Sequence, residues 1–109
     1  MAVRGTGRVE LPAYGLADAE HQVEKEVRAL WPDASVDVLD VARADDASRI
    51  VEEFRVRYRV RGVVPAGGDT PADARKAALR TLRETFSGSR YARVAWEVVE
   101  AGSGDAKGA

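Results

Sequence analysis

Ten residues in the middle of the chain alternate between charged and apolar side chains. The stretch EEFRVRYRVR (52–61) places Phe54, Val56, Tyr58 and Val60 at every second position, with arginines between and after them. A period of two is typical of a β-strand with one buried face. We therefore predict a strand whose apolar side faces the core and whose arginines face outward.

Two longer segments repeat apolar residues at the spacing of an α-helix. Residues 16–31 (LADAEHQVEKEVRALW) stop at Pro32, which disfavours a helical conformation in the residue before it. The second segment begins at Thr70, a suitable N-cap followed by Pro71, and stops near Gly88, where a left-handed C-cap is expected. The expected apolar stripes are Leu16, Ala19, Val23, Val27, Leu30 and Trp31 in the first helix, and Ala74, Ala78, Leu82 and Phe86 in the second.

Three further segments predict strands. They are GRVELPA (7–13), SVDVLDVARA (35–44) and RYARVAWEVVE (90–100). Gly5 and Gly7 weaken the beginning of the first strand, because glycine has no side chain to pack there. In the second, Val36 and Val38 point inward and Val41 breaks the alternation, which indicates a β-bulge. The turn-like DDAS (45–48) then joins this strand to the central one as a hairpin loop.

The predicted elements follow the order β-α-β-β-α-β. The chain resembles two βαβ halves, since LPAYGLADA (11–19) is similar to VPAGGDTPADA (64–74). Right-handed crossovers in both halves put the two helices on one side of a four-stranded antiparallel sheet. We therefore predict an α+β, ferredoxin-like βαββαβ two-layer sandwich with one open sheet face.

Composition limits the class of protein. The chain has 109 residues and no cysteine, which suits one domain and excludes disulfides, zinc thiolates and cysteine nucleophiles. We expect a single α+β domain at 1–100 and a flexible C-terminal tail at 101–109. No apolar run approaches the roughly 20 residues that cross a bilayer, so we expect no membrane contact. A cytoplasmic location agrees with the lack of cysteine.

The net charge of −1 conceals an uneven distribution. Residues 1–48 hold five basic and ten acidic side chains, whereas residues 49–109 hold twelve basic and eight acidic ones. A chain with such a division can pair with itself, within one molecule or between copies. The second predicted helix carries Arg75, Lys76, Arg80 and Arg83, which we interpret as structural charges that face the acidic first helix.

The arginines of the central strand mark the surface with the clearest functional potential. Burying four guanidinium groups costs far more than the fold can recover, so they face the open side of the sheet. The same alternation places Arg4, Arg8, Glu10, Tyr91, Arg93 and Glu97 on that side, with Ala92, Val94, Trp96 and Val98 in the core. The candidate anion- or partner-binding residues are Arg55, Arg57, Arg59, Arg61, Arg8 and Arg93.

Three interpretations of this surface remain open. It is a solvated face whose arginines pair with nearby carboxylates, for example Asp37 if the register places it opposite Arg57. Alternatively, it binds phosphate or carboxylate groups, including a nucleic-acid backbone, because arginine forks suit both groups. In the third interpretation, two copies meet sheet to sheet as a homodimer.

Signals for catalysis are weak. His21 is the only histidine, which excludes a histidine-based triad or a multi-histidine metal site within one chain. Glu52 and Glu53 are adjacent in a strand and therefore project to opposite faces. RNA-binding RRM domains share the predicted topology, but the third strand here exposes arginines instead of their stacking aromatics. We expect no cofactor and no metal.

These observations favour a small, non-enzymatic binding or assembly module. Its arginine-rich open sheet face would meet an anionic partner or a second copy of the chain. The alternative is a small-molecule-binding protein or cofactor-independent enzyme of the dimeric α+β-barrel kind. That alternative requires a pocket between sheet and helices near Tyr14, Tyr58 and Trp96.

Overall fold

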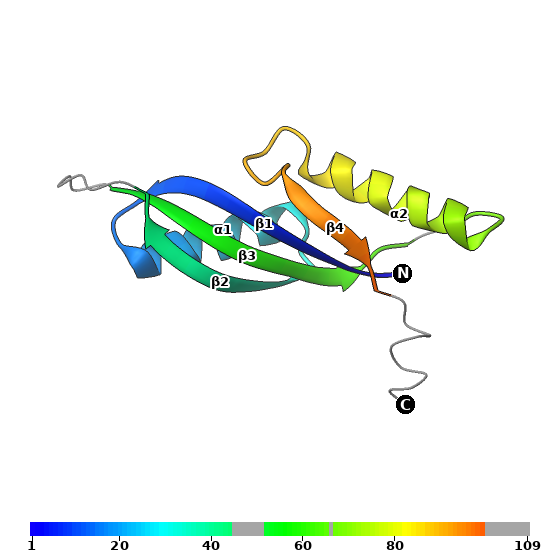
Figure 1. Cartoon of the computed structure of the whole chain (residues 1–109), viewed down its shortest axis with the longest axis horizontal. Coiled ribbons are helices and arrows are strands. Elements are labelled where there is room, and N and C mark those ends of the chain that lie inside the picture. Colours follow the sequence, from blue (N-terminus) through cyan, green and yellow to red (C-terminus); the bar gives the residue numbers. More distant parts are fainter. Residues whose placement is uncertain (45–51, 66, 100–109) are drawn as a thin grey trace, which may run out of the picture.

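The computed structural model describes residues 1–44, 52–65 and 67–99, which form a four-stranded antiparallel sheet and two helices (Figure 1). The elements are β1 (Ala2–Ala13), α1 (Leu16–Leu30), β2 (Ser35–Arg43), β3 (Glu52–Val63), α2 (Pro71–Phe86) and β4 (Val94–Val98). The strand order is β2-β3-β1-β4, so the long strands β1 and β3 are central. The predicted ferredoxin-like βαββαβ arrangement is confirmed. The predicted hairpin loop (45–48) and tail (101–109) lie outside the described residues.

The core lies between the sheet and the helices, and the alternation of β3 is its centre. Phe54, Val56, Tyr58 and Val60 are fully buried, whereas the arginines of β3 are exposed or half-buried, as predicted. Both helices contribute an apolar stripe to the same core. These stripes are Ala19, Val23 and Val27 from α1, and Ala78, Leu82 and Phe86 from α2. The helices therefore cover one face of the sheet and leave the other face open.

Aromatic rings lie directly over glycines of β1. Gly5 pairs with Trp96 of β4, and Gly7 pairs with Tyr58 of β3. A Cβ atom on Gly5 would lie 2.5 Å from Trp96 Cε3, and one on Gly7 would lie 2.5 Å from Tyr58 Oη. Both distances are far below van der Waals contact, so only glycine lets these rings approach the strand. The glycines that weaken β1 locally are thus required by the packing above it.

The helix ends follow the predicted chemistry, with one exception. The Thr70 side chain accepts a hydrogen bond from the Asp73 N–H at 3.1 Å, and Gly88 has a φ of +79° just beyond α2. The exception is Leu16, which was expected in the apolar stripe but is 52% exposed: it is the first residue of α1, and the buried stripe begins only at Ala19. At the same end, Asp18 accepts hydrogen bonds from the Tyr14 N–H and from Gln22.

The last strand is shorter than predicted, and Tyr91 is the main correction. β4 begins at Val94, so residues 90–93 are not in a strand, and the side chains of Tyr91 and Ala92 do not follow its alternation. Tyr91 is 2% exposed and belongs to the core, not to the open face, while Ala92 is exposed. The Tyr91 ring meets Tyr58 edge to face at 5.6 Å, and its hydroxyl donates to Glu26 of α1 at 2.6 Å.

The predicted irregularity of β2 is present and changes its register with β3. A shift between Val38 and Asp40 leaves Leu39 unpaired and restores Val41 to a position opposite Val56. Asp37 consequently lies opposite Arg59, not Arg57. The carboxylate of Asp37 instead accepts a hydrogen bond from the Arg61 guanidinium at 3.0 Å, along a diagonal.

Candidate anion-binding surface

The open face of the sheet carries all six arginines named as candidate binding residues. Five of them are exposed and Arg59 is half-buried, and the strand pairings divide the face into rows that run across the sheet. One row contains Ser35, Arg61, Arg4 and Glu97, the next Asp37, Arg59, Thr6 and Ala95, the third Asp40, Arg57 and Arg8, and the fourth Ala42, Arg55 and Glu10. Arg93, one residue before β4, continues the third row beside Arg8.

Three arginines of this face are neutralised within the molecule. Arg55 Nε donates to Glu10 at 3.2 Å, and Arg61 donates to Asp37 at 3.0 Å. Arg4 Nε donates to Glu97 at 2.8 Å. All three pairs are exposed, so each contributes only about 0–1 kcal/mol to stability. These pairs also leave three cations and three acids of the open face already bound within the molecule.

The third row is different, and we call Arg8, Arg57 and Arg93 the arginine cluster. Arg8 lies directly opposite Arg57, and none of the three guanidinium groups forms an ion pair within residues 1–44, 52–65 and 67–99. Asp40 lies beyond Arg57 in the same row but makes no ion pair with it. Like charges directly opposite each other in a sheet are destabilising, typically by a few tenths of a kcal/mol to about 1 kcal/mol.

The arginine cluster surrounds a shallow depression of about 500 Å³. Thr6, Gly7 and Ala95 line it together with the three arginines. The hollow exists because the short side chains of Thr6 and Ala95 lie beside long arginines. No carboxylate lines it. The depression therefore presents guanidinium donors and one hydroxyl to a solvent-accessible space.

This arrangement suits a multiply charged oxyanion. Guanidinium groups form paired, charge-assisted hydrogen bonds with phosphate or carboxylate oxygens, and several around one group match a phosphate best. The open-face positions of β1 to β4 carry no aromatic ring, so a nucleobase would find no stacking surface there. The donors of this face are therefore better suited to phosphate oxygens than to nucleobases.

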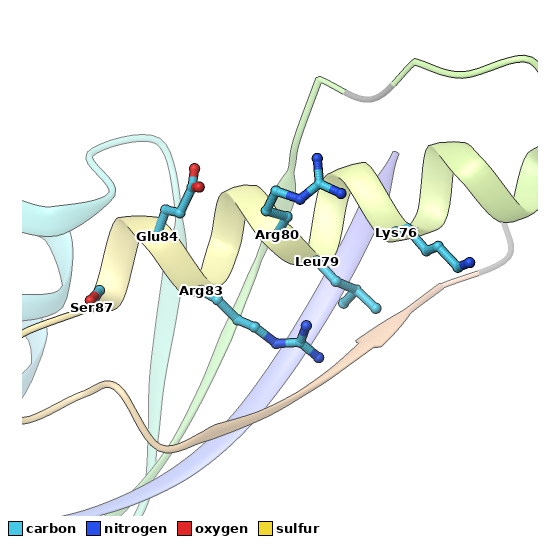
Figure 2. A pocket seen from close by; sticks show the side chains of 6 residues that line it. All are labelled: Lys76, Leu79, Arg80, Arg83, Glu84 and Ser87. Carbon is cyan, nitrogen blue, oxygen red and sulfur yellow. The ribbon is translucent and has the colours of Figure 1, made fainter.

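A second cationic hollow lies on α2 and was not predicted as a binding surface. It measures about 560 Å³ and is lined by Lys76, Leu79, Arg80, Arg83, Glu84 and Ser87 (Figure 2). In Figure 2, Lys76, Leu79 and Arg83 point toward β4, whereas Arg80 and Glu84 project from the other side of the helix. Lys76, Arg80 and Arg83 form no ion pair with α1 within the described residues, so the expected attraction between the helices has no such contact at these three side chains.

The interior holds two tyrosines whose ionisation is suppressed. Burial raises the pKa of Tyr58 to about 12, and no hydrogen-bond partner of its hydroxyl is present among the described residues. Burial, followed by the hydrogen bond to Glu26, raises the pKa of Tyr91 still further. Both groups stay neutral at physiological pH, so neither is suited to act there as a base.

Raising the pH should therefore destabilise the protein through Tyr58. The unfolded chain releases this proton near pH 10 and the folded chain only near pH 12, so stability is complete below pH 10 and falls as the pH rises toward 12. Tyr58→Phe keeps the shape and removes the ionisation. Urea denaturation at pH 8 to 12 should show the variant gaining up to about 3 kcal/mol on wild type. Tyr14→Phe, at an exposed ring, is the control, and an equal gain there would contradict this account.

Other candidate groups do not assemble into a site. His21 is exposed on α1, as expected for a solvated residue. Among the described residues, no group of three or more His, Asp or Glu side chains could hold a metal ion. Tyr14 is 73% exposed and follows the far end of β1, whereas Tyr58 and Trp96 pack over Gly7 and Gly5. These three aromatics therefore do not line one pocket.

The register of three strands creates the arginine cluster. The sequence predicted that its three members lie on the open face, but not that these three come together. Arg8, Arg57 and Arg93 meet because β1 pairs with β3 on one side and with β4 on the other.

A scan against protein-family models, a search of curated proteins and a search of solved structures each gave no match for the chain. Within the described residues, no helix is long and apolar enough to cross a membrane.

Proposed function

We propose that this protein is a non-enzymatic module that binds a phosphate-bearing partner at the arginine cluster on its open sheet face. One observation carries the proposal: Arg8, Arg57 and Arg93 surround a depression of about 500 Å³ that contains no carboxylate. Arg4, Arg55 and Arg61 on the same face are paired with acids, whereas the cluster, like the half-buried Arg59 beside it, forms no ion pair among the described residues. A bound oxyanion would remove the repulsion between Arg8 and Arg57.

A second copy of the chain is a poorer partner for this surface. A two-fold axis through the cluster would place its three arginines against the identical group on the other copy. Asp40, which forms no ion pair among the described residues, is one carboxylate against three arginines, and Glu10 and Glu97 are held by Arg55 and Arg4 within the molecule. Breaking those pairs would return as much unpaired charge as it removes. An anionic partner of different chemistry is therefore favoured over a sheet-to-sheet homodimer.

The arginine cluster would contact only the phosphate oxygens of the partner. The proposal therefore does not specify the rest of the partner molecule. Polyphosphate, a phosphorylated metabolite and a nucleic-acid backbone all present the same group. A nucleic acid would bind without base preference and with a steep loss of affinity in salt. A cytoplasmic location, which agrees with the absence of cysteine, is part of this proposal.

Replacing the arginine cluster should abolish phosphate binding. In Arg8→Gln/Arg57→Gln/Arg93→Gln we expect pyrophosphate affinity to fall at least about a hundredfold, since each charge-assisted hydrogen bond contributes about 1.5–3 kcal/mol. Isothermal titration calorimetry at low salt measures this directly. Repeating the titration in about 0.5 M NaCl should weaken binding to wild type. A short single-stranded oligonucleotide, measured in parallel, separates small phosphates from a nucleic-acid backbone.

The matched control removes the same amount of charge from the same face. Arg4→Gln/Arg55→Gln/Arg61→Gln changes three arginines that are already paired with acids, so affinity should fall less than about tenfold. Equal losses in both triple variants would show that only net charge matters. Unchanged binding in the cluster variant would refute the proposal.

A further inference from the structure

The outer edge of β4 has backbone groups with no partner among the described residues. β4 is the last strand in the order β2-β3-β1-β4. The Val99 N–H donates to the Ala2 carbonyl at 2.9 Å, so residue 99 faces β1. Because backbone groups alternate sides along a strand, those of Val94, Trp96 and Val98 face away from β1. This edge offers three N–H and three C=O groups to an additional strand.

The core beside this edge is incompletely covered. Val94, Trp96 and Val98 are half-buried, as is Leu79 of α2, although all four pack against the core. In Figure 1, α2 lies beside β4, and Figure 2 shows Leu79 pointing toward β4 between Lys76 and Arg83. Leu79 also lines the hollow of about 560 Å³, whose other lining residues belong to α2 or, as Ser87, follow it directly. An apolar side chain from an added strand would contact Leu79 there.

The basic side chains that line the hollow favour an acidic partner. Lys76, Arg80 and Arg83 line it with one acid, Glu84, and none of these four side chains forms an ion pair within the described parts of the chain. A second copy that paired its own β4 here would bring its α2 toward this one and oppose like charges. An extended peptide with acidic side chains satisfies both the backbone edge and the cations.

We propose that the β4 edge binds an extended peptide of the pattern acid–x–apolar–x–acid by adding it to the sheet as a fifth strand. Lys76 and Arg83 are seven residues apart, a rise of about 10.5 Å along the helix axis, and Leu79 lies between them in Figure 2. Residues four apart in a strand are about 13 Å apart and project to the same face. Two acids can therefore reach the two cations while the residue midway between them meets Leu79.

This surface is separate from the arginine cluster. No residue lines both hollows, and the cluster lies on the open face while α2 covers the other. The peptide site can therefore be confirmed or refuted independently of phosphate binding. A protein with both sites would join a phosphate-bearing molecule to an acidic polypeptide.

The test uses the full chain and a labelled peptide containing Glu-Thr-Val-Thr-Glu. Fluorescence anisotropy should show binding that is at least about tenfold tighter than for Lys-Thr-Val-Thr-Lys. Hydrogen exchange should slow at the amides of Val94, Trp96 and Val98. N-methylation of one alternate set of peptide residues should abolish binding, because it blocks the hydrogen bonds to β4, whereas methylation of the other set should be tolerated.

Charge reversal on α2 completes the test. Lys76→Glu/Arg83→Glu should reverse the preference, so that the basic peptide binds more tightly than the acidic one. Lys25→Glu/Arg28→Glu makes the same change on exposed positions of α1 and should leave the preference as in wild type. Equal binding of both peptides to wild type, no reversal in the α2 variant, or protection of amides elsewhere would each overturn the proposal.

Discussion

Replacing Gly5 and Gly7 together with alanine should remove a large share of the protein's stability. Each new Cβ would lie 2.5 Å from an aromatic side chain, that of Trp96 at Gly5 and that of Tyr58 at Gly7. Overpacking of this kind costs about 1–3 kcal/mol at each site, against a total stability of about 5–15 kcal/mol for a domain of this size. Thermal unfolding followed by circular dichroism should show a large fall in Tm for each single variant and a larger one for the pair.

The control for this prediction is Gly67→Ala. A Cβ at Gly67 meets nothing within 4 Å, and its φ is not positive, so alanine should be neutral or slightly stabilising. If the three single variants shift Tm equally, the loss would reflect glycine replacement in general. A Tm for Gly5→Ala/Gly7→Ala close to that of wild type would contradict the packing described for β1.

Phe86→Ala should lower the free energy of unfolding by about 3–5 kcal/mol. Domains of this size have a total stability of about 5–15 kcal/mol, so the loss is a large fraction of it. Phe86 is 1% exposed and is the last residue of the buried stripe of α2. Its ring lies 5.3 Å from that of Trp96 and 6.4 Å, edge to face, from that of Trp31. Truncation leaves a cavity between these rings and removes the contact that holds the C-terminal end of α2.

Urea denaturation and near-ultraviolet circular dichroism measure this effect. The midpoint should fall sharply, and the tryptophan signal should weaken because Trp31 and Trp96 both lose their contact with the Phe86 ring. Arg83→Ala, on the exposed side of the same helix, should change stability by no more than about 0.5 kcal/mol. A small effect of Phe86→Ala would show that α2 is not held by this cluster of rings.

The fold could be predicted from sequence wherever one local pattern decides the structure. Strict alternation fixed the inward residues of β3, since reversing them would bury arginines. Likewise, the Thr70 cap depends only on residues within one turn. Tyr91 was assigned wrongly because the point at which β4 begins depends on its pairing with β1, where Gly7 meets Val94. No signal within residues 90–100 marks that limit.

The candidate site shows the same division between local and long-range information. Alternation placed the arginines on the open face, but which of them lack acids depends on register. The bulge of β2 moved Asp37 opposite Arg59, and a diagonal contact then joined it to Arg61. Such diagonal pairs cannot be derived from one strand alone. The glycines of β1 did hold an unused signal, because a glycine inside a strand often marks the close approach of another group.

The most direct test of the account observes the arginine side chains themselves. Their Nε–Hε groups can be followed by nuclear magnetic resonance while pyrophosphate is added to the wild-type protein. The signals of Arg8, Arg57 and Arg93 should shift together and saturate at one concentration, while those of Arg55 and Arg61 remain nearly unchanged. Shifts confined to Arg80 and Arg83 on α2, or no saturable shift in the arginine cluster, would contradict the assignment of the open face as the phosphate-binding surface.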